Sequence, residues 1–179
     1  MGVTTSSNSA ATYVPIATQT LANSTTATIT FSSIPSTYTD LILVSNFGLT
    51  ANNTIIGRFN GDGASTGLYS DTNLLGNGTT ASSNRDTSNN HFYLSVNLNG
   101  STNKVESQSI IQFMNYANTT TYKSYLTRDG SLTATTGNGT EASAGLYRST
   151  SAISSIALTA GTGFIYTGST FTLYGIKAA

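Results

Sequence analysis

The chain has 179 residues, no cysteine, one histidine and a net charge of zero, because seven basic side chains balance seven acidic ones. This length suits one domain with its own core, and the lack of cysteine excludes disulfides and cysteine-ligated metal sites. A neutral chain with so few charges lacks the basic surface that holds nucleic acid or anionic membranes. We therefore expect one domain without a nucleic-acid or membrane partner.

Short uncharged polar side chains dominate the composition, with 33 Thr, 25 Ser and 17 Asn. Thr, Tyr, Phe and Ile favour strands, Ser, Asn and Gly favour turns, and the helix formers Glu, Lys, Arg and Gln are scarce. The composition therefore predicts an all-β fold. Residues Met1–Thr12 are small and polar without periodicity, and they predict a flexible arm that orders on a partner, which leaves 13–179 as the domain.

The first strand patterns lie in the N-terminal third. Thr26–Phe31 alternates between polar and apolar residues, which predicts a half-buried strand. Asp40–Ser45 contains four successive aliphatic residues and predicts a central strand covered on both faces. Thr54–Phe59 follows and ends at the turn Asn60–Gly63. None of these apolar stretches approaches the length of a membrane-spanning helix, and the N-terminus does not resemble a secretory signal.

The middle of the chain begins with a polar segment. Gly76–Asn90 has no hydrophobic residue larger than alanine and predicts a long loop, either a disordered excursion or a contact loop. His91–Leu98 then shows the clearest alternation of the chain. We expect every second residue from Phe92 onward to face the core, with His91 and Ser95 on the solvent side. The strand ends at Asn99-Gly100, a strong hairpin signal.

Shorter patterns predict further strands near Ser107–Met114, Tyr122–Thr127, Ser143–Tyr147, Ile153–Leu158 and Thr170–Ile176. The total is eight to ten short, closely spaced strands with no alternation of strands and helices. This organisation favours a single-domain antiparallel β-sandwich or jelly roll over a parallel α/β fold.

Few residues offer chemistry. One histidine without cysteine cannot form a two-His or His/Cys zinc site within one chain, and we interpret His91 as a solvated surface residue rather than a catalytic base. Gly63–Gly67 matches the Gly-x-Ser-x-Gly pattern of a serine nucleophile elbow, but no helix pattern follows, so we interpret it as a turn. We predict no enzyme activity and no catalytic, cofactor-binding or metal-binding residues.

The carboxylates leave one alternative open. Two carboxylates about 5–9 Å apart can hydrolyse glycosides, and six are scattered over predicted loops and strand faces: Asp62, Asp71, Asp86, Glu106, Asp129 and Glu141. Asp62 and Asp129 stand in glycine-containing turns, where aspartate is a common turn residue. An EF-hand calcium loop starting at Asn60 or Asp62 is excluded, because Ala64 falls where a ligand oxygen is required.

Three stretches stand out: Phe31–Leu41, Arg58–Asp62, and Gly145–Ile156 closing on Phe171–Ile176, which together span nearly the whole chain. They resemble segments of small virion proteins of tailed bacteriophages, notably phages of cyanobacteria and marine bacteria. It implies a jelly-roll domain that serves as a capsid decoration protein or as part of a tail fibre. No catalytic residue transfers with it.

Individual residues of these stretches have structural interpretations. Pro35 after Ile34 ends a strand and sets a turn, and Asp40 can bond the backbone as the next strand opens. We expect Arg58 and Arg148 to clamp loop carbonyls or an acidic partner such as Asp40 or Asp62, with ligand binding as the alternative. Tyr174 is interpreted as a core-edge tyrosine with a bonded hydroxyl, with sugar stacking as the alternative.

Our first functional hypothesis is a decoration or cement protein on the outer surface of a phage head. It would be made in the host cytoplasm and bind the major capsid protein as a homotrimer. Three Lys and two Glu in the chain suit this role, because protein interfaces are depleted in both. The alternative is an adsorption module of a tail fibre that binds host-surface polysaccharide. The chain shows no coiled-coil heptads, which favours the first hypothesis. A third is a lectin-like protein unrelated to virions.

Overall fold

The computed structural model describes residues 12–23, 25–50, 53–63, 67–98, 107–131 and 139–177. In this part of the chain every regular element is a strand, and no helix is long and apolar enough to cross a membrane. The strands are β1 (Tyr13–Thr20), β2 (Thr28–Phe31), β3 (Asp40–Phe47), β4 (Asn53–Phe59), β5 (Tyr69–Gly76), β6 (Ala81–Asn89), β7 (Phe92–Leu98), β8 (Ser107–Met114), β9 (Lys123–Ser131), β10 (Thr140–Tyr147), β11 (Ile156–Ala160) and β12 (Thr170–Ile176).

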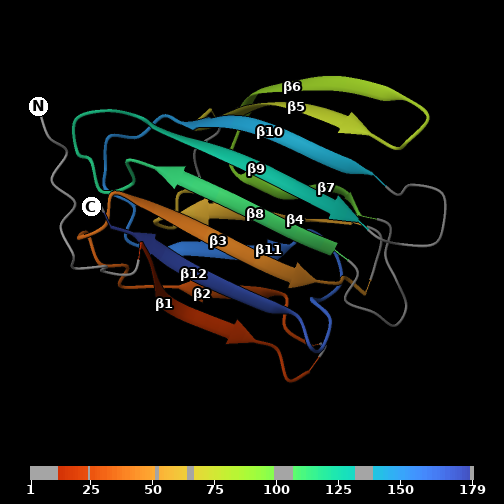
Figure 1. Cartoon of the computed structure of the whole chain (residues 1–179), viewed down its shortest axis with the longest axis horizontal. Coiled ribbons are helices and arrows are strands. Elements are labelled where there is room, and N and C mark those ends of the chain that lie inside the picture. The colour runs from red at the N-terminus through yellow and green to blue at the C-terminus, as the bar shows by residue number, and fades with distance from the viewer. Residues whose placement is uncertain are drawn as a thin grey trace, which may run out of the picture.

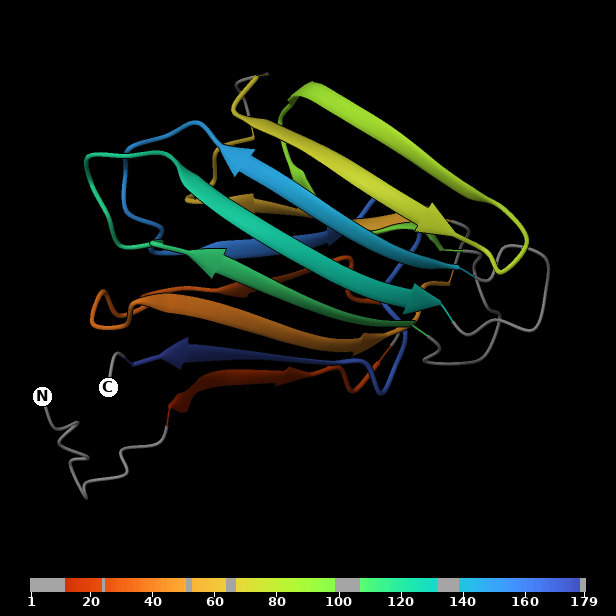
Figure 2. The same ribbon diagram turned by 45° about the horizontal axis from the view of Figure 1, so that its top comes forward.

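The strands form two antiparallel sheets that pack face to face. The larger sheet has eight strands in the order β1-β12-β3-β8-β9-β10-β5-β6, and the smaller has four in the order β2-β11-β4-β7. Figure 1 shows the larger sheet in front of the smaller one, and Figure 2 shows β5 and β6 at the far edge of the larger sheet. This confirms the predicted all-β antiparallel sandwich.

The pairing order identifies the sandwich as a jelly roll. Four nested pairs, β1–β12, β2–β11, β3–β8 and β4–β7, divide between the two sheets as in a doubled Greek key. Two further hairpins, β5–β6 and β9–β10, are inserted between these strands. Because β9 pairs with β8 and β10 pairs with β5, both insertions widen the larger sheet on the same side.

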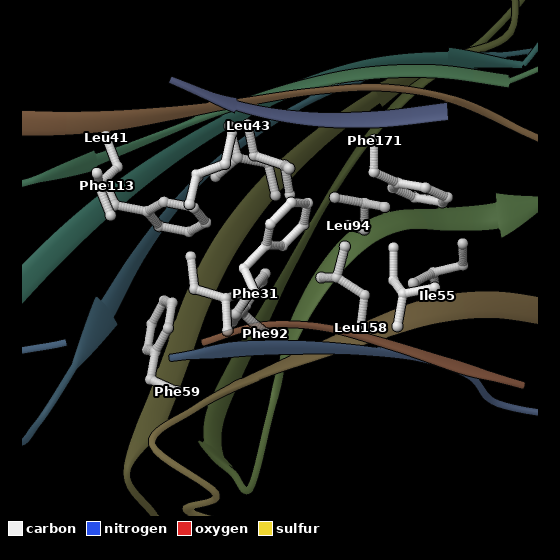
Figure 3. Close-up of a cluster of buried hydrophobic side chains, with 14 of the residues drawn as sticks. Phe31, Leu41, Leu43, Ile55, Phe59, Phe92, Leu94, Phe113, Leu158 and Phe171 are labelled. Atoms are coloured by element: carbon white, nitrogen blue, oxygen red, sulfur yellow. The ribbon is translucent and has the colours of Figure 1, made fainter. Parts of the chain in front are cut away.

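The core lies between the sheets and follows the alternation of the strands. Inward-facing residues of β3 and β8, such as Leu41, Leu43 and Phe113, meet Phe31, Phe59 and their neighbours from the smaller sheet (Figure 3). Aromatic rings fill its centre: the Phe59 centroid lies 4.8 Å from that of Phe92 and 5.2 Å from that of Phe113. Such offset and edge-on pairs fix how the two sheets pack.

Nine of the twelve strands match predicted ones, and the polar segment Gly76–Asn90 is the clearest correction. It contains no long loop. Ala81–Asn89 forms β6, and the turn before it is held by Asn77, whose Oδ1 accepts from the backbone amides of Thr79 at 3.0 Å and Thr80 at 2.8 Å. As an edge strand with most side chains exposed, β6 needs backbone pairing with β5 rather than apolar residues.

Two orientations also differ from the predictions. Ser95 was expected to face solvent but is 2% exposed, because β-bulges between β4 and β7 interrupt the alternation, so that Leu94 and Ser95 are both buried. The side chains of β7 beyond Ser95 lie outside the described residues. β3 is central in its sheet, as predicted, but its outer face is only half covered at Ile42 and Val44.

Candidate functional site

The segments that carry the family resemblance meet at the start of β11. Asn60, directly after β4, accepts through Oδ1 from the backbone amide of Ser154 at 2.9 Å and donates from Nδ2 to the Ala152 carbonyl at 2.9 Å. The amide of Ile34 donates to the Ser154 carbonyl at 2.9 Å. Asn60 adopts φ of 53°, a left-handed conformation that asparagine tolerates better than most residues. These residues therefore hold loops together.

The two arginines of these segments have the predicted clamping role. Arg58 Nε donates to the carbonyl of Asn90 at 3.2 Å. Arg148 donates from one terminal nitrogen to the Gly67 carbonyl at 3.0 Å and from the other to Ser70 Oγ at 2.8 Å. Both guanidinium groups thus fasten loops, which is a structural use of their fixed donor geometry.

Asp40 also bonds as predicted, although on the neighbouring strand. Its two carboxylate oxygens accept from the Asn115 amide and the Gln112 side chain, each at 2.9 Å. Tyr174 differs from the prediction: it lies half-buried on the outer face of the larger sheet, opposite Ile42, rather than at the edge of the core.

His91 is half-buried, which corrects its interpretation as a solvated residue. Its Nδ1 lies 2.7 Å from Asn90 Oδ1, and its ring packs edge-on against Tyr93 at 4.7 Å. Burial, followed by the charge of Arg58, lowers the pKa of His91. Ser65 of the Gly-x-Ser-x-Gly match lies outside the described residues, so no geometry joins it to His91.

The fold brings four of the six carboxylates together in two pairs on the inner face of the inserted strands. Asp71 of β5 stands directly opposite Asp86 of β6, and Asp129 of β9 stands directly opposite Glu141 of β10. Asp62 instead accepts a hydrogen bond from the Tyr147 hydroxyl. Glu106 lies outside the described residues.

The Asp129–Glu141 pair borders a hollow of about 240 Å³ between β9, β10 and the β5–β6 turn. Burial raises the pKa of Asp129 to about 6, although a hydrogen bond from Ser95 Oγ lowers it in part. Small and polar residues line the hollow, including Ser82, Thr140 and Ser131. Among these lining residues there is no aromatic side chain that would stack on a sugar ring.

The Asp71–Asp86 pair also has one buried member. Asp71 is 5% exposed, and its burial together with the charge of Asp86 raises its pKa to about 6. Within the described residues no three His, Asp or Glu side chains gather as a metal centre. The pair thus offers two carboxylates, and any further ligand atoms must come from other types of side chain nearby.

The outer face of the larger sheet presents a different feature, which we call the outer patch: Ile42, Leu74, Ile110, Leu126, Ala142 and Ala144. Leu74 is 62% exposed, Leu126 46% and Ile110 42%. These residues surround a hollow of about 650 Å³ that extends from β3 to β5. The strand patterns did not predict this patch, because its residues alternate with core residues and resemble those of a strand buried on both faces.

Known proteins offer no identification, since neither a protein-family model nor a curated protein matches this chain. The outer patch and the two carboxylate pairs are thus the features from which function can be inferred.

Proposed function

We propose that the chain is a non-enzymatic structural protein of a tailed-phage virion, which decorates the outside of the head and binds the major capsid protein through the outer patch. The observation that carries this proposal is the exposure of Leu74, Leu126 and Ile110 around one hollow on a wide sheet face. Contiguous apolar surface of this kind on a folded protein marks sites of interaction with other macromolecules. The resemblance to phage virion proteins supports the choice of partner.

The register of the larger sheet makes the patch continuous. In one cross-strand row, Ile110 of β8 stands between Val44 and Arg128. In the next row, Leu126 of β9 stands between Gln112 and Ala144. Ile110 and Leu126 are therefore diagonal neighbours on adjacent strands. Arg128 supplies the charge among the residues that line the hollow. Docking therefore buries apolar area, worth about 25 cal/mol per Å², while it strips few charges of water.

The proposal includes a homotrimer. A phage shell offers three-fold and local three-fold positions, and a closed trimer on such a position presents three copies of the outer patch to neighbouring capsid subunits. Once one copy is bound, the others bind at high effective concentration, so weak individual contacts add up to stable attachment.

Most tyrosines give the polysaccharide alternative little support, although Tyr174 lies on the outer face of the larger sheet opposite Ile42. Tyr69, Tyr116, Tyr125 and Tyr147 are fully buried and serve the core rather than a sugar-binding surface. Tyr13 and Tyr122 are about half exposed, but neither lines the hollows beside the outer patch or the carboxylate pairs.

Co-sedimentation with undecorated heads of the phage that encodes the chain tests the proposal. Wild-type protein should pellet with the heads in a saturable manner, and Leu126→Glu should weaken binding by about tenfold or more, because it places a charge in the centre of the interface. Phe164→Glu is the matched control, since Phe164 is equally exposed, at 43%, but lies outside the outer patch.

Equal effects of the two substitutions would show that the outer patch is not the docking surface. Failure of the wild-type protein to bind heads, together with specific binding on a glycan array, would replace the decoration role with polysaccharide adsorption. Light scattering of the pure protein checks the trimer, and a stable monomer would remove that part of the proposal.

A further inference from the structure

The inner face of the inserted strands is polar, unlike the apolar inner face of the jelly roll itself. Four residues that stand opposite one another on adjacent strands form one row across the sheet. In order they are Tyr125 of β9, Gly145 of β10, Asp71 of β5 and Asp86 of β6. Asn73 follows Asp71 by two residues and shares its face. The row and Asn73 together place two carboxylates, an amide and a phenol on one side of the sheet.

A β-bulge creates the carboxylate pair. Tyr69 pairs with Asn89, which without irregularity would set Asp71 opposite Thr87, but the register shifts by one residue between Tyr69 and Asp71. The shift brings Asp86 opposite Asp71 instead. Like charges directly opposite on neighbouring strands destabilise a sheet, so this local geometry is unfavourable unless something neutralises the pair.

Several oxygen atoms beside the pair lack hydrogen-bond partners in the described part of the chain. They are Asp71 Oδ1, Asn73 Oδ1 and the Tyr125 hydroxyl, on residues that are 5%, 3% and 1% exposed. Buried polar atoms are nearly always paired with protein, water or an ion. Three such atoms on one face therefore call for a partner, which can be water or a bound ion.

Gly145 explains how the Tyr125 hydroxyl reaches this place. The ring of Tyr125 lies across Gly145, where any Cβ would collide with the ring and the hydroxyl. Because Gly145 is also the cross-strand neighbour of Asp71, the hydroxyl is directed over β10 toward the carboxylates. The charges of Asp71 and Asp86 both raise the pKa of Tyr125, in addition to the larger effect of burial, in agreement with this placement.

We propose that Asp71, Asp86 and Asn73 bind a divalent cation of the calcium type, with the Tyr125 hydroxyl at its side. All these donors are oxygen atoms, which suits Ca²⁺ and not Zn²⁺, whose protein sites rely on histidine and cysteine. Ca²⁺ accepts irregular coordination completed by water, whereas Mg²⁺ requires near-octahedral geometry. Water can reach the site from β6, where Asn84, the cross-strand neighbour of Asn73, is exposed.

The cation would fasten the outermost hairpin of the larger sheet. It would neutralise the repulsion between Asp71 and Asp86 and thereby join β6 to β5 through side chains as well as backbone. This role is independent of the decoration function, and it applies equally to a protein with another function.

Terbium luminescence tests the site directly. Tb³⁺ occupies calcium sites and emits when nearby tyrosines are excited, and this chain has ten Tyr and no Trp. Protein freed of metal with EDTA should show saturable Tb³⁺ emission that Ca²⁺ displaces, and Ca²⁺ alone should raise Tm. Asp71→Asn and Asp86→Asn should each weaken Tb³⁺ binding by more than about tenfold. Even the mutation of residues that only hydrogen-bond to metal ligands commonly lowers metal affinity by that much.

Two controls separate this site from other carboxylates. Asp62→Asn removes a carboxylate that also contacts a tyrosine, and Glu141→Gln alters the second carboxylate pair. Both should keep the emission and the Ca²⁺-dependent rise in Tm. Absence of saturable emission in the wild-type protein would overturn the proposal, and so would emission that Glu141→Gln abolishes and Asp71→Asn leaves unchanged.

The metal-free variants supply a second readout that checks folding. Without metal, Asp71→Asn should raise Tm relative to the wild type, because it removes the repulsion with Asp86. A variant that gains stability yet no longer responds to Ca²⁺ cannot be explained by unfolding. A fall in Tm of metal-free Asp71→Asn would contradict the proposed repulsion.

Discussion

Asn60 Oδ1 accepts a hydrogen bond from the backbone amide of Ser154 at 2.9 Å and thereby joins two loops that lie 94 residues apart in sequence. The same oxygen accepts from the Ser155 amide at 3.3 Å, and the side-chain amide donates to the Ala152 carbonyl. One side chain thus completes the backbone hydrogen bonding of the segment that leads into β11.

Asn60→Ala should therefore destabilise the fold. The substitution leaves several backbone groups without partners and puts alanine in a left-handed conformation, and we expect a loss of about 2–3 kcal/mol in the free energy of unfolding. Urea denaturation followed by circular dichroism measures it. Asn77→Ala is the matched control, because Asn77 bonds only within an exposed turn in the described hydrogen bonds, and it should cost under about 1 kcal/mol. Equal losses would contradict the role of Asn60.

Gly145→Ala should be destabilising although its added volume is one methyl group. The new Cβ collides with the Tyr125 ring in the interior, and overpacking of this kind costs about 1–3 kcal/mol. Gly130→Ala is the control, because a Cβ there meets nothing closer than 3.9 Å. In a double-mutant cycle, Tyr125→Ala should remove most of the penalty of Gly145→Ala. Additive losses would show that the two residues do not interact.

Stability should depend on pH through Asp71. Its pKa rises from 3.8 to about 6 on folding, so the unfolded chain loses its proton first, and the stability of the metal-free protein should fall as pH rises from about 4 to about 6. Asp129, whose pKa is also raised, likewise lowers stability as pH rises. His91, whose pKa is lowered, has the opposite effect and raises stability as pH rises. A comparison with Asp71→Asn isolates the contribution of Asp71.

The advantage in Tm of Asp71→Asn over the wild type should be small near pH 4 and should grow up to about pH 6 in EDTA. Above that range both states of the wild type are ionised at Asp71, and the advantage should stay constant. Thermal unfolding across this pH range provides the test. An advantage that does not change with pH would mean that Asp71 ionises as readily in the folded chain as in the unfolded one.

Deletion of residues 1–11 should leave the fold intact and weaken attachment to phage heads. The cut spares Thr12, whose carbonyl accepts from the Lys177 amide at 3.2 Å beside β1. We expect an unchanged Tm and a lower bound fraction in the co-sedimentation assay, because polar arms of this composition order on partners. Replacement of the same residues by a Gly/Ser segment of equal length distinguishes sequence from length. Undiminished attachment of the deletion variant would exclude the arm from docking.

The antiparallel sandwich was predictable from sequence because its core strands alternate in polarity, as Thr28–Phe31 and Thr170–Ile176 do. The strand β6 was not, because an exposed edge strand carries no apolar signal. The opposition of Asp71 and Asp86 depends on a one-residue bulge, which no pattern in the sequence marks. The outer patch was hidden because Ile42 and Ile110 resemble residues buried between two layers.

The nested pairing of the strands constrains the order in which the chain can fold during synthesis. The partner of β1 is β12, the last strand, and β5 needs β10, which is made about seventy residues later. The hairpin β5–β6 therefore leaves the ribosome before the edge on which it docks exists. Long-range pairing of this kind delays folding until the chain is nearly complete. Until then β5 has no partner on its other side, and the serine and asparagine residues of β6 protect the free side of the hairpin from pairing with other chains, as they still do at the edge of the finished sheet.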